Sequence, residues 1–477
     1  MDEIPESDNP RAQLAAAILA AGMGTRMRSN LPKVLHRVAG DPLISHVLDA
    51  ARLSDATDVV VVVGHGRDRV MSTLGQSVRY AVQEPQLGTG HALQKAVDLM
   101  SPVPAKILVL YGDVPLITPD TIRRMLAEGD GAAIVVLTAR VLDPTGYGRV
   151  VRDDEGRVTA IVEEADASSS QKAIDEINSG LYCFDGGWLV ANLGKIERSA
   201  KGEYYLTDLF ATAVAQGREV RAILADDAAE VEGVNDREQL AEADRVLRQR
   251  FCRRVMHAGV TVVDPSTTYI GKDVLVGGDT VIQPGTHLRG MTVIGERCEI
   301  GPNTIVEDST IGNECRILAS VIEESTVADN VSVGPFSHLR PGAVISSGVK
   351  LGNYAEVKNS VIGPGVQMHH FSYVGDAEVG AETNVGAGTI TCNFDGRTRK
   401  KYRTKIGKGV FLGSDTLLRA PVELGDGAQT GAGAVVTKDV PAGKLAVGVP
   451  ARIRGMHGRE TPSEGQTDRG GEGEVGS

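Results

Sequence analysis

The sequence predicts an α/β protein in two parts, an N-terminal Rossmann-like nucleotide-handling domain and a C-terminal parallel β-helix. A glycine-rich loop from Gly22 to Arg26 follows a short apolar run and has the form of a phosphate-binding turn. In the C-terminal half, aliphatic residues recur every six positions, usually with glycine next, which is typical of a solenoid of short strands. The 57 glycines and the low aromatic content of 4% suit the tight turns of such a solenoid.

The composition is that of a globular protein with an acidic surface. With 42% hydrophobic residues the chain can bury a core, and its length suggests about two to four domains. The formal net charge of −12 argues against binding to nucleic acid or to an anionic membrane. The five cysteines are odd in number and scattered along the chain, with neither CxxC spacing nor the pattern of a disulfide framework. This indicates a reducing compartment, the cytoplasm. The cysteines are Cys183, Cys252, Cys298, Cys315 and Cys392.

The nucleotide-handling domain is expected over residues 13–235, after a disordered leader at residues 1–12. The apolar run from Leu14 is too short to cross a membrane, so it indicates a buried first strand. Expected strands at 15–20, 59–63 and 107–111 alternate with expected helices at 45–53 and 91–99, which indicates a mostly parallel sheet covered on both faces. The site of such a sheet lies at the carboxyl ends of its strands.

A linker helix is expected over residues 236–258. Leu240, Ala243, Leu247 and Phe251 have the three-four spacing of a helical face, and Asp236 can cap its N-terminus.

The β-helix is expected over residues 259–453, and the resemblance described below implies that it is left-handed. Three hexapeptides would make one triangular coil, with the aliphatic residue pointing inward and glycine helping the chain to turn. A basic insert, Asp395 to Lys405, interrupts the repeat and must loop out, and residues 454–477 should form a disordered tail. The inward-facing residues fall in three registers, Ile270, Val276, Ile282, Leu288, Ile294, Ile300 and Val306; Val327, Val333, Leu339, Ile345, Leu351 and Val357; and Ile406, Leu412, Leu418, Leu424, Thr430 and Val436.

The glycine-rich loop carries its own cations. Gly22 and Gly24 let the backbone approach a phosphate, and Arg26 and Lys33 can stabilise its charge in a transition state. A plain surface turn explains the two glycines equally well. A dinucleotide-binding loop is less suitable, because the third glycine of GxGxxG is missing.

Several further motifs in order resemble those of the sugar-1-phosphate nucleotidylyltransferases. The glycine-rich loop continues into Leu31–Leu35, and the later segments are Gln83–Ala92, Tyr111–Pro115, Tyr147–Arg149, Ile161–Glu164, Asn178–Gly180 and Gly233–Asn235. The amide of Gln83 offers the donor and the acceptor that uracil needs, and Asp113 and Asn235 offer oxygen ligands suited to Mg²⁺. The resemblance implies that Arg26 and Lys33 act in catalysis and that Asp113 and Asn235 are metal ligands. It also implies a site for UTP and the UDP-sugar, formed by Leu19, Ala20, Gly22, Lys33, Gln83, Gly88, Thr89, Tyr111, Gly148, Glu163, Asn178 and Asn235.

The second half resembles the acetyltransferase domain of the bacterial bifunctional N-acetylglucosamine-1-phosphate uridylyltransferase/glucosamine-1-phosphate acetyltransferases. The segments that carry this resemblance are Leu339–Gly342, Glu356–Lys358, His370–Asp376 and Asn384–Gly396. Polar residues of a β-helix usually face water, but these fall in neighbouring coils beside the basic insert. The resemblance implies that His370 is the general base, that Arg340, Lys358, Tyr373, Asn384 and Lys401 bind glucosamine-1-phosphate, and that Asn393, Ser414 and Ala432 bind acetyl-CoA.

Two departures from that family leave assignments open. The insert is about two residues longer than expected, so Lys400 competes with Lys401 as its phosphate ligand. Gly448 replaces an arginine that meets coenzyme A, and Lys444 or Arg452 could substitute for it. In an extended segment, His369 would point away from His370.

The sequence thus predicts a bifunctional, Mg²⁺-dependent enzyme, expected to be a cytoplasmic homotrimer, that makes UDP-N-acetylglucosamine. It would acetylate glucosamine-1-phosphate with acetyl-CoA and then transfer a uridylyl group from UTP to N-acetylglucosamine-1-phosphate. The alternatives are a monofunctional nucleotidylyltransferase with a structural β-helix, and a non-catalytic scaffold. The length of the β-helix argues against a purely structural role, because residues 262–440 would make about ten coils of about eighteen residues. The presence of Arg26, Lys33 and Asp113 argues against a non-catalytic scaffold.

Overall fold

The computed structural model describes residues 14–199 and 202–456, so the leader at 1–12 and most of the expected tail lie outside the described residues. The chain divides into two compact units between Arg250 and Phe251. The linker helix expected over residues 236–258 corresponds to helix α8 (Arg237–His257), which runs across this division.

Unit 1 is built on one mixed sheet of nine strands, whose central order is β11-β7-β10-β6-β1-β4-β5. Strands β1, β4, β5 and β6 run parallel, and β10 pairs antiparallel with both β6 and β7. The short strands β8 and β9 attach through β10. The bounds are β1 (Leu14–Ala20), β4 (Ala56–Val63), β5 (Arg79–Val82), β6 (Lys106–Tyr111), β7 (Ile134–Arg140), β8 (Arg149–Arg152), β9 (Val158–Val162), β10 (Glu176–Asp185) and β11 (Val220–Leu224).

Both faces of this sheet are buried. Successive side chains of a strand point to opposite faces, and in β1 Ala16, Ile18 and Ala20 belong to one hydrophobic cluster while Ala15, Ala17 and Leu19 belong to the other. This explains why β1 is apolar throughout and lacks alternation. The α-helices of this unit that precede α8 are α1 (Leu43–Leu53), α2 (Arg67–Leu74), α3 (Thr89–Val97), α4 (Pro119–Glu128), α5 (Ser169–Lys172), α6 (Gly186–Leu193) and α7 (Asp208–Ala215).

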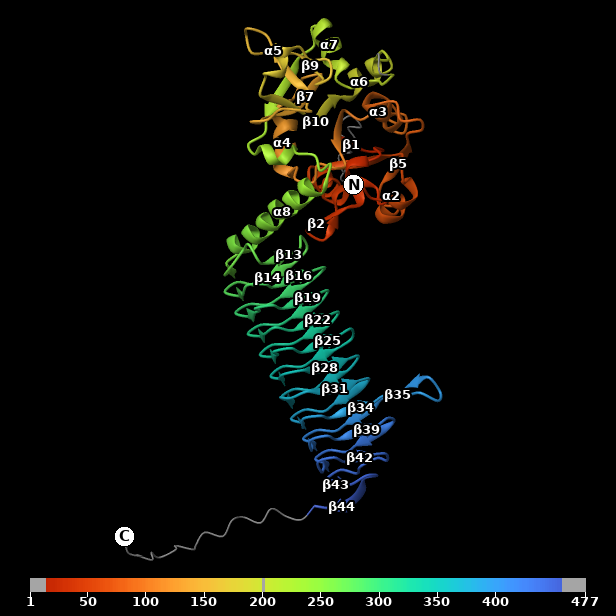
Figure 1. Cartoon of the computed structure of the whole chain (residues 1–477), viewed down its shortest axis with the longest axis vertical. Coiled ribbons are helices and arrows are strands. Elements are labelled where there is room, and N and C mark those ends of the chain that lie inside the picture. The colour runs from red at the N-terminus through yellow and green to blue at the C-terminus, as the bar shows by residue number, and fades with distance from the viewer. Residues whose placement is uncertain (1–13, 200–201, 457–477) are drawn as a thin grey trace, which may run out of the picture. The chain divides into compact units, whose positions relative to one another are not determined.

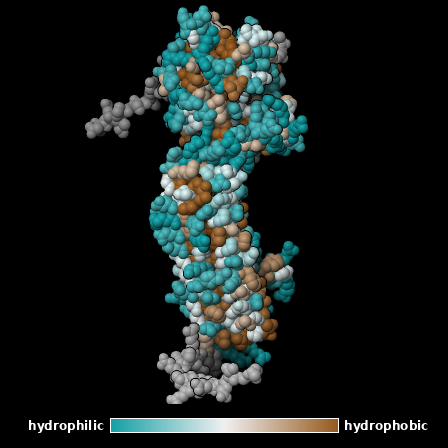
Figure 2. Space-filling model, turned by 60° about the vertical axis from the view of Figure 1, so that its left-hand side comes forward, coloured by the Kyte–Doolittle hydropathy of each residue, from teal (hydrophilic) through white to brown (hydrophobic). Residues whose placement is uncertain are grey.

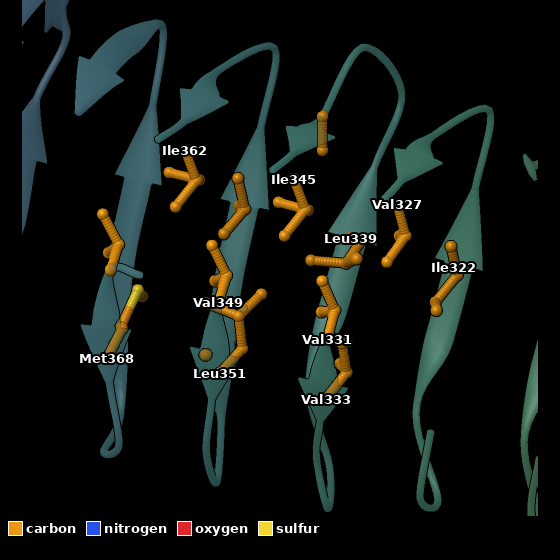
Figure 3. Close-up of a cluster of buried hydrophobic side chains, with 14 of the residues drawn as sticks. Ile322, Val327, Val331, Val333, Leu339, Ile345, Val349, Leu351, Ile362 and Met368 are labelled. Carbon is orange, nitrogen blue, oxygen red and sulfur yellow. The ribbon is translucent and has the colours of Figure 1, made fainter. Parts of the chain in front are cut away.

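Unit 2 is a parallel β-helix of three sheets, with one short strand of each coil in each sheet (Figure 1). The sheets hold twelve, ten and nine strands, and they begin at β12 (Thr261–Val262), β13 (Tyr269–Ile270) and β14 (Leu275–Val276). Apart from Val276, which is partly exposed, the residues of the three predicted registers are buried. Figure 3 shows Val327, Leu339 and Ile345 among side chains that fill the interior of neighbouring coils. The predicted fold class is therefore confirmed for both units.

The predicted insert is a hairpin with different bounds. Strands β35 (Phe394–Asp395) and β36 (Lys400–Lys401) pair antiparallel and project from the stack of coils (Figure 1). The chain has returned to the nine-stranded sheet at β37 (Thr404–Ile406), where Thr404 is buried. The expectation that the loop extends to Lys405 was wrong, because Lys405 pairs with Glu378 in the ladder.

The β-helix ends on an antiparallel pair. Strand β44 (Arg452–Gly455) returns along β43 (Lys444–Val447), so Arg454 and Gly455 are ordered although the tail was expected to begin at residue 454. Among the described residues, none of the helices has the length and apolarity that a membrane crossing requires. Figure 2 shows hydrophobic residues scattered among hydrophilic ones on the visible face of the β-helix.

Candidate active sites

Unit 1 contains a cavity of about 410 Å³ at the carboxyl ends of β1 and β6. Residues from the glycine-rich loop, from the segment that begins α3 and from the end of β6 meet there, although they are far apart in the sequence. The predicted residues that line the cavity are Leu19, Ala20, Gly22, Lys33, Gln83, Gly88, Thr89, Tyr111 and Asp113. Sequence reasoning did not place Gln86 or Glu203 in this site, but both line it as well.

Gly24 is the glycine that the loop requires. Its φ of +61° lies in the left-handed region, and a Cβ there would come within 2.7 Å of Cβ of Lys33. Arg26 follows in the short helix η1 (Thr25–Met27), where it is exposed and does not line the cavity. Burial raises the pKa of Tyr147, and the charge of Arg26 partly opposes that rise.

Three polar side chains meet beside the cavity, of which Lys33 and Asp113 line it and Asn235 does not. Nζ of Lys33, on the short helix η2 (Lys33–Leu35), pairs with the carboxylate of Asp113 and donates to Oδ1 of Asn235 at 3.1 Å. The backbone supports this arrangement, because the N–H of Val234 donates to the carbonyl of Asp113 at 2.8 Å. The lysine ammonium therefore occupies the point on which two oxygen donors converge.

This donor set fits Mg²⁺. The ion takes oxygen ligands and usually keeps several waters and substrate phosphates, so one carboxylate and one amide oxygen are sufficient protein ligands. The described residues contain no cluster of three or more His, Cys, Asp or Glu side chains suited to a metal. A metal in this cavity would thus depend on Asp113, Asn235 and the substrate.

Gln83 also lines the cavity. Its side chain is buried, and Nε2 donates to the carbonyl of Gly88 at 2.9 Å. A Cβ on Gly88 would lie 2.7 Å from the carbonyl oxygen of Tyr204, so this position also requires glycine. Nε2 of Gln86 donates to the carbonyl of Ala21 at 2.5 Å and thereby ties this segment to the glycine-rich loop.

Tyr111 connects the cavity to the predicted sugar residues. Burial, together with the carboxylates of Glu163 and Asp113, raises its pKa, while a hydrogen bond with Thr89 opposes this effect. Burial also raises the pKa of Glu163, whose Oε1 accepts a hydrogen bond from Thr207 at 3.1 Å. Glu163 is therefore half-buried beside the cavity and does not line it directly.

Asn178 and Gly148 form a buried pair next to this group. The backbone N–H of Asn178 donates to the carbonyl of Gly148 at 2.8 Å, and Nδ2 of Asn178 donates to the Tyr182 hydroxyl at 2.7 Å. Neither residue lines the cavity itself.

In unit 2, a basic group lies on the outer face of the ten-stranded sheet. Arg340 of β25 (His338–Arg340) is in register with Lys358 of β28 (Ala355–Lys358), and NH1 of Arg340 donates to Oε1 of Glu356 at 2.8 Å. The ammonium of Lys401 lowers the pKa of Lys358, with a smaller effect from Arg340. The structure thus places Lys401 of the hairpin beside Lys358, which favours Lys401 over Lys400 as the candidate phosphate ligand of the hairpin.

Two further predicted residues lie next to this group, Tyr373 on a neighbouring strand and Asn393 at the adjoining corner. Tyr373 of β31 (Ser372–Gly375) is in register with Glu356. Nδ2 of Asn393 donates to the Tyr373 hydroxyl at 3.4 Å and to the carboxylate of Asp376. Sequence reasoning quoted Asp376 within a motif but gave it no role.

His370 lies in a turn between β30 (Gln367–Met368) and β31. Both His369 and His370 are exposed, so the expectation that they alternate as in a strand does not apply. Ser414 and Ala432 occupy the equivalent corner two residues after β38 (Phe411–Leu412) and β41 (Gln429–Thr430), and both are exposed. Because β30, β33, β38 and β41 are neighbours in one sheet, these residues follow one edge of the prism.

Asn384 is on a different face. It belongs to β33 (Asn384–Val385) of the twelve-stranded sheet, whereas Arg340, Lys358 and Tyr373 belong to the ten-stranded sheet. Within the chain, no described contact joins Asn384 to them.

The last coils contain a cavity of about 290 Å³ that includes Lys438 and Arg452. Arg452 lines this cavity, whereas Lys444 does not.

The fold and the two sites define a nucleotidyltransferase joined to a hexapeptide-repeat acyltransferase. Three family models match, the MobA-like NTP transferase domain over residues 16–172, the EIF2B subunit epsilon LbH domain over 253–357 and the hexapeptide repeat of succinyl-transferase over 403–438. These matches agree with the predicted left-handed β-helix.

Full-length relatives identify the family. The bifunctional protein GlmU of Trichlorobacter lovleyi is 50% identical over 91% of this chain and 95% of its own length. GlmU of Heliobacterium modesticaldum is 50% identical over 91% of this chain and 94% of its own length, and GlmU of Streptomyces avermitilis is 47% identical over 94% and 95%. The chain belongs to the GlmU family and is a bifunctional enzyme with uridylyltransferase and acetyltransferase activities.

Proposed function

We propose that the two units carry out successive steps in the synthesis of UDP-N-acetylglucosamine, at the residues described above. Unit 2 acetylates glucosamine-1-phosphate with acetyl-CoA, and unit 1 transfers the uridylyl group of UTP to the product and releases pyrophosphate. The observation that carries this proposal is that each unit has its own cationic side chains beside its candidate site. They are Lys33 in unit 1 and Arg340, Lys358 and Lys401 in unit 2. Such cations suit a phosphorylated substrate.

In the acetyl transfer, His370 accepts a proton from the sugar amine while the amine nitrogen attacks the thioester carbon. The new N–C bond replaces the C–S bond, and the leaving thiolate of coenzyme A takes up the proton from His370 and departs as the thiol. An imidazole is suited to such a proton transfer near neutral pH. Arg340, Lys358 and Lys401 hold the sugar phosphate, and Tyr373 and Asn393 orient the sugar and the reacting centre. Ser414 and Ala432 contact coenzyme A along the same edge as His370.

In the uridylyl transfer, the sugar phosphate attacks the α-phosphorus of UTP in line with the departing pyrophosphate. Gln83, Gly88 and Thr89 hold the uracil, and Gly148, Glu163 and Asn178 hold the sugar. Lys33 and Arg26 offset the charge of the phosphates, because such reactions depend on positioning and charge neutralisation. Asp113 and Asn235 would hold Mg²⁺, which would supply additional positive charge on the phosphate oxygens.

We also infer a homotrimer. The outward positions of the nine-stranded sheet include the exposed apolar residues Leu275, Val293, Val344 and Val361, which suit a contact between β-helices. An interface would also bring Asn384, which lies on another sheet, close to a sugar site on a neighbouring copy. The scattered cysteines suit the reducing cytoplasm.

The test is a coupled assay with the purified full chain. With glucosamine-1-phosphate, acetyl-CoA, UTP and Mg²⁺, we expect thiol release, pyrophosphate release and UDP-N-acetylglucosamine by mass spectrometry. Omitting acetyl-CoA should stop product formation, and supplying N-acetylglucosamine-1-phosphate should restore it. Pyrophosphate release without any acetyl transfer would instead support a monofunctional nucleotidylyltransferase with a structural β-helix.

A further inference from the structure

Asp376 is a buried carboxylate at a corner of the β-helix. It lies between β31 and β32 (Ala377–Val379), the residue is 6% exposed, and its backbone has a φ of +50°. Its N–H donates to the carbonyl of Lys358 at 3.0 Å, and its carbonyl accepts from the N–H of Thr404 at 3.2 Å. Asp376 therefore lies between the coil that carries Lys358 and the strand that follows the hairpin.

Two asparagines from neighbouring coils donate to this carboxylate. Oδ1 accepts a hydrogen bond from Nδ2 of Asn359 at 2.6 Å, and Oδ2 accepts one from Nδ2 of Asn393. The three residues occupy the same corner in successive coils. A buried carboxylate at this place is costly unless its oxygens are hydrogen-bonded, and both are satisfied.

The pairing fixes the orientation of the Asn393 amide. An ionised carboxylate only accepts hydrogen bonds, so Asn393 must present its NH₂ group and not its carbonyl oxygen to Asp376. Nδ2 of Asn393 also donates to the Tyr373 hydroxyl at 3.4 Å, so both of its hydrogens are committed. The carbonyl oxygen of the amide is then turned away from Asp376.

We propose that Asp376 is a positioning residue for acetyl transfer, which acts by holding the Asn393 amide in one orientation next to Tyr373. This inference rests on the proposed acetyl-transfer function of unit 2. Asp376 need not touch the substrate. Its contribution is that Asn393 meets the reacting groups already oriented, which lowers the entropic cost of reaching the transition state.

The test is Asp376→Asn in the full chain. Asparagine has the same shape and tolerates a left-handed backbone, but its amide can present either a donor or an acceptor to Asn393. We expect the kcat for thiol release to fall about tenfold or more, because small misplacements of reacting groups are costly. Isothermal titration with glucosamine-1-phosphate should retain its stoichiometry and a Kd within about threefold, since Arg340, Lys358 and Lys401 are unchanged. A merely structural role would instead lower the binding stoichiometry and the kcat together, and that result would overturn the proposal.

Asp308→Asn is the matched control. Asp308 also lies at a β-helix corner with a left-handed backbone, φ +47°, and Oδ1 accepts from the N–H of Met291 at 2.9 Å. It is exposed and has no role in either site, so both activities should remain unchanged.

A double variant keeps the proposal testable if Asp376→Asn folds poorly. Asp376→Asn with Asn393→Asp restores a carboxylate–amide pair but removes the amide at position 393. We expect the melting temperature to recover and thiol release to remain low, whereas recovery of both would show that only packing matters and would overturn the proposal. If the unmodified chain itself releases no thiol while uridylyl transfer proceeds, the proposed acetyl transfer fails. Normal thiol release by both the unmodified chain and Asp376→Asn defeats this inference alone.

Discussion

The ammonium of Lys33 pairs with the carboxylate of Asp113, although the two residues are 80 positions apart in the sequence. The same ammonium donates to Asn235 at 3.1 Å. Lys33 therefore contacts both oxygen donors that we propose as Mg²⁺ ligands, and a metal ion there would compete with the lysine for the same two side chains. Binding of the metal would release Lys33 toward the phosphates.

This competition predicts that Lys33→Met binds Mg²⁺ more tightly than the unmodified chain when no substrate is present. The Kd, measured by isothermal titration, should fall several-fold because the carboxylate no longer loses its lysine partner. Uridylyl transfer should nevertheless decrease, since the phosphates lose a cation. Lys106→Met is the control, because Lys106 pairs with Asp130 at 2.8 Å and neither lines the cavity. A weaker Mg²⁺ affinity for Lys33→Met would contradict the shared-ligand explanation.

The adjacent histidines should differ in their effect on acetyl transfer. His370→Ala should lower the rate of thiol release about 10²- to 10⁴-fold, the usual cost of removing a positioned base. Nε2 of His369 donates to Oε1 of Gln367 at 3.0 Å, and His369→Ala should change the rate by less than about threefold. Thiol release measured across pH for both variants checks this. A severe defect in His369→Ala with a mild one in His370→Ala would reverse the two roles.

The hairpin lysines provide a second matched pair. Successive side chains of a strand point to opposite faces, so Lys401 beside Lys358 implies that Lys400 points away. Lys401→Met should raise the KM for glucosamine-1-phosphate about tenfold, since one charge-assisted hydrogen bond to the phosphate is lost. The KM for acetyl-CoA should change little. Initial rates for Lys401→Met and Lys400→Met give the comparison, and a larger effect of Lys400→Met on the sugar KM would reverse the assignment.

Local patterns in the sequence predicted the parts of the molecule that depend on short spacings. The six-residue registers predicted the inward side chains of the coils, and the glycine spacing predicted the turn in which Gly24 has a positive φ. The contacts across coils were not predictable in the same way. Asn359, Asp376 and Asn393 follow one another at intervals of 17 residues, whereas a coil of three hexapeptides has 18. Their alignment at one corner therefore depends on coils that are one residue shorter than the repeat predicts. The pairing of Lys33 with Asp113 likewise depends on how the strands of the sheet are ordered.

Glu163 should make the stability of the protein depend on pH. Burial raises its pKa, so the folded state retains a proton that the unfolded state loses, and stability falls as the pH rises from the unfolded pKa through the higher folded pKa. Glu163→Gln removes this penalty, because a glutamine oxygen can still accept from Thr207. We expect a higher melting temperature for the variant at neutral pH and no gain below about pH 4, where the glutamate is protonated in both states. An equal gain at both pH values would show that the charge is not the cause.

Gly375 is the position at which one methyl group should disturb the acetyl-transfer site. A Cβ there would lie 2.2 Å from the hydroxyl oxygen of Tyr373, so in Gly375→Ala the tyrosine ring must move, and its contact with Asn393 is lost. We expect the kcat/KM for glucosamine-1-phosphate to fall about tenfold or more. The melting temperature should change little, because the half-buried ring can move toward solvent. Gly278→Ala is the control, since its Cβ would meet no atom within 4 Å. Tyr373→Phe separates the hydroxyl from the ring position: if it matches Gly375→Ala, loss of the hydroxyl contact is sufficient, and unchanged kinetics in Gly375→Ala would contradict the role of Tyr373.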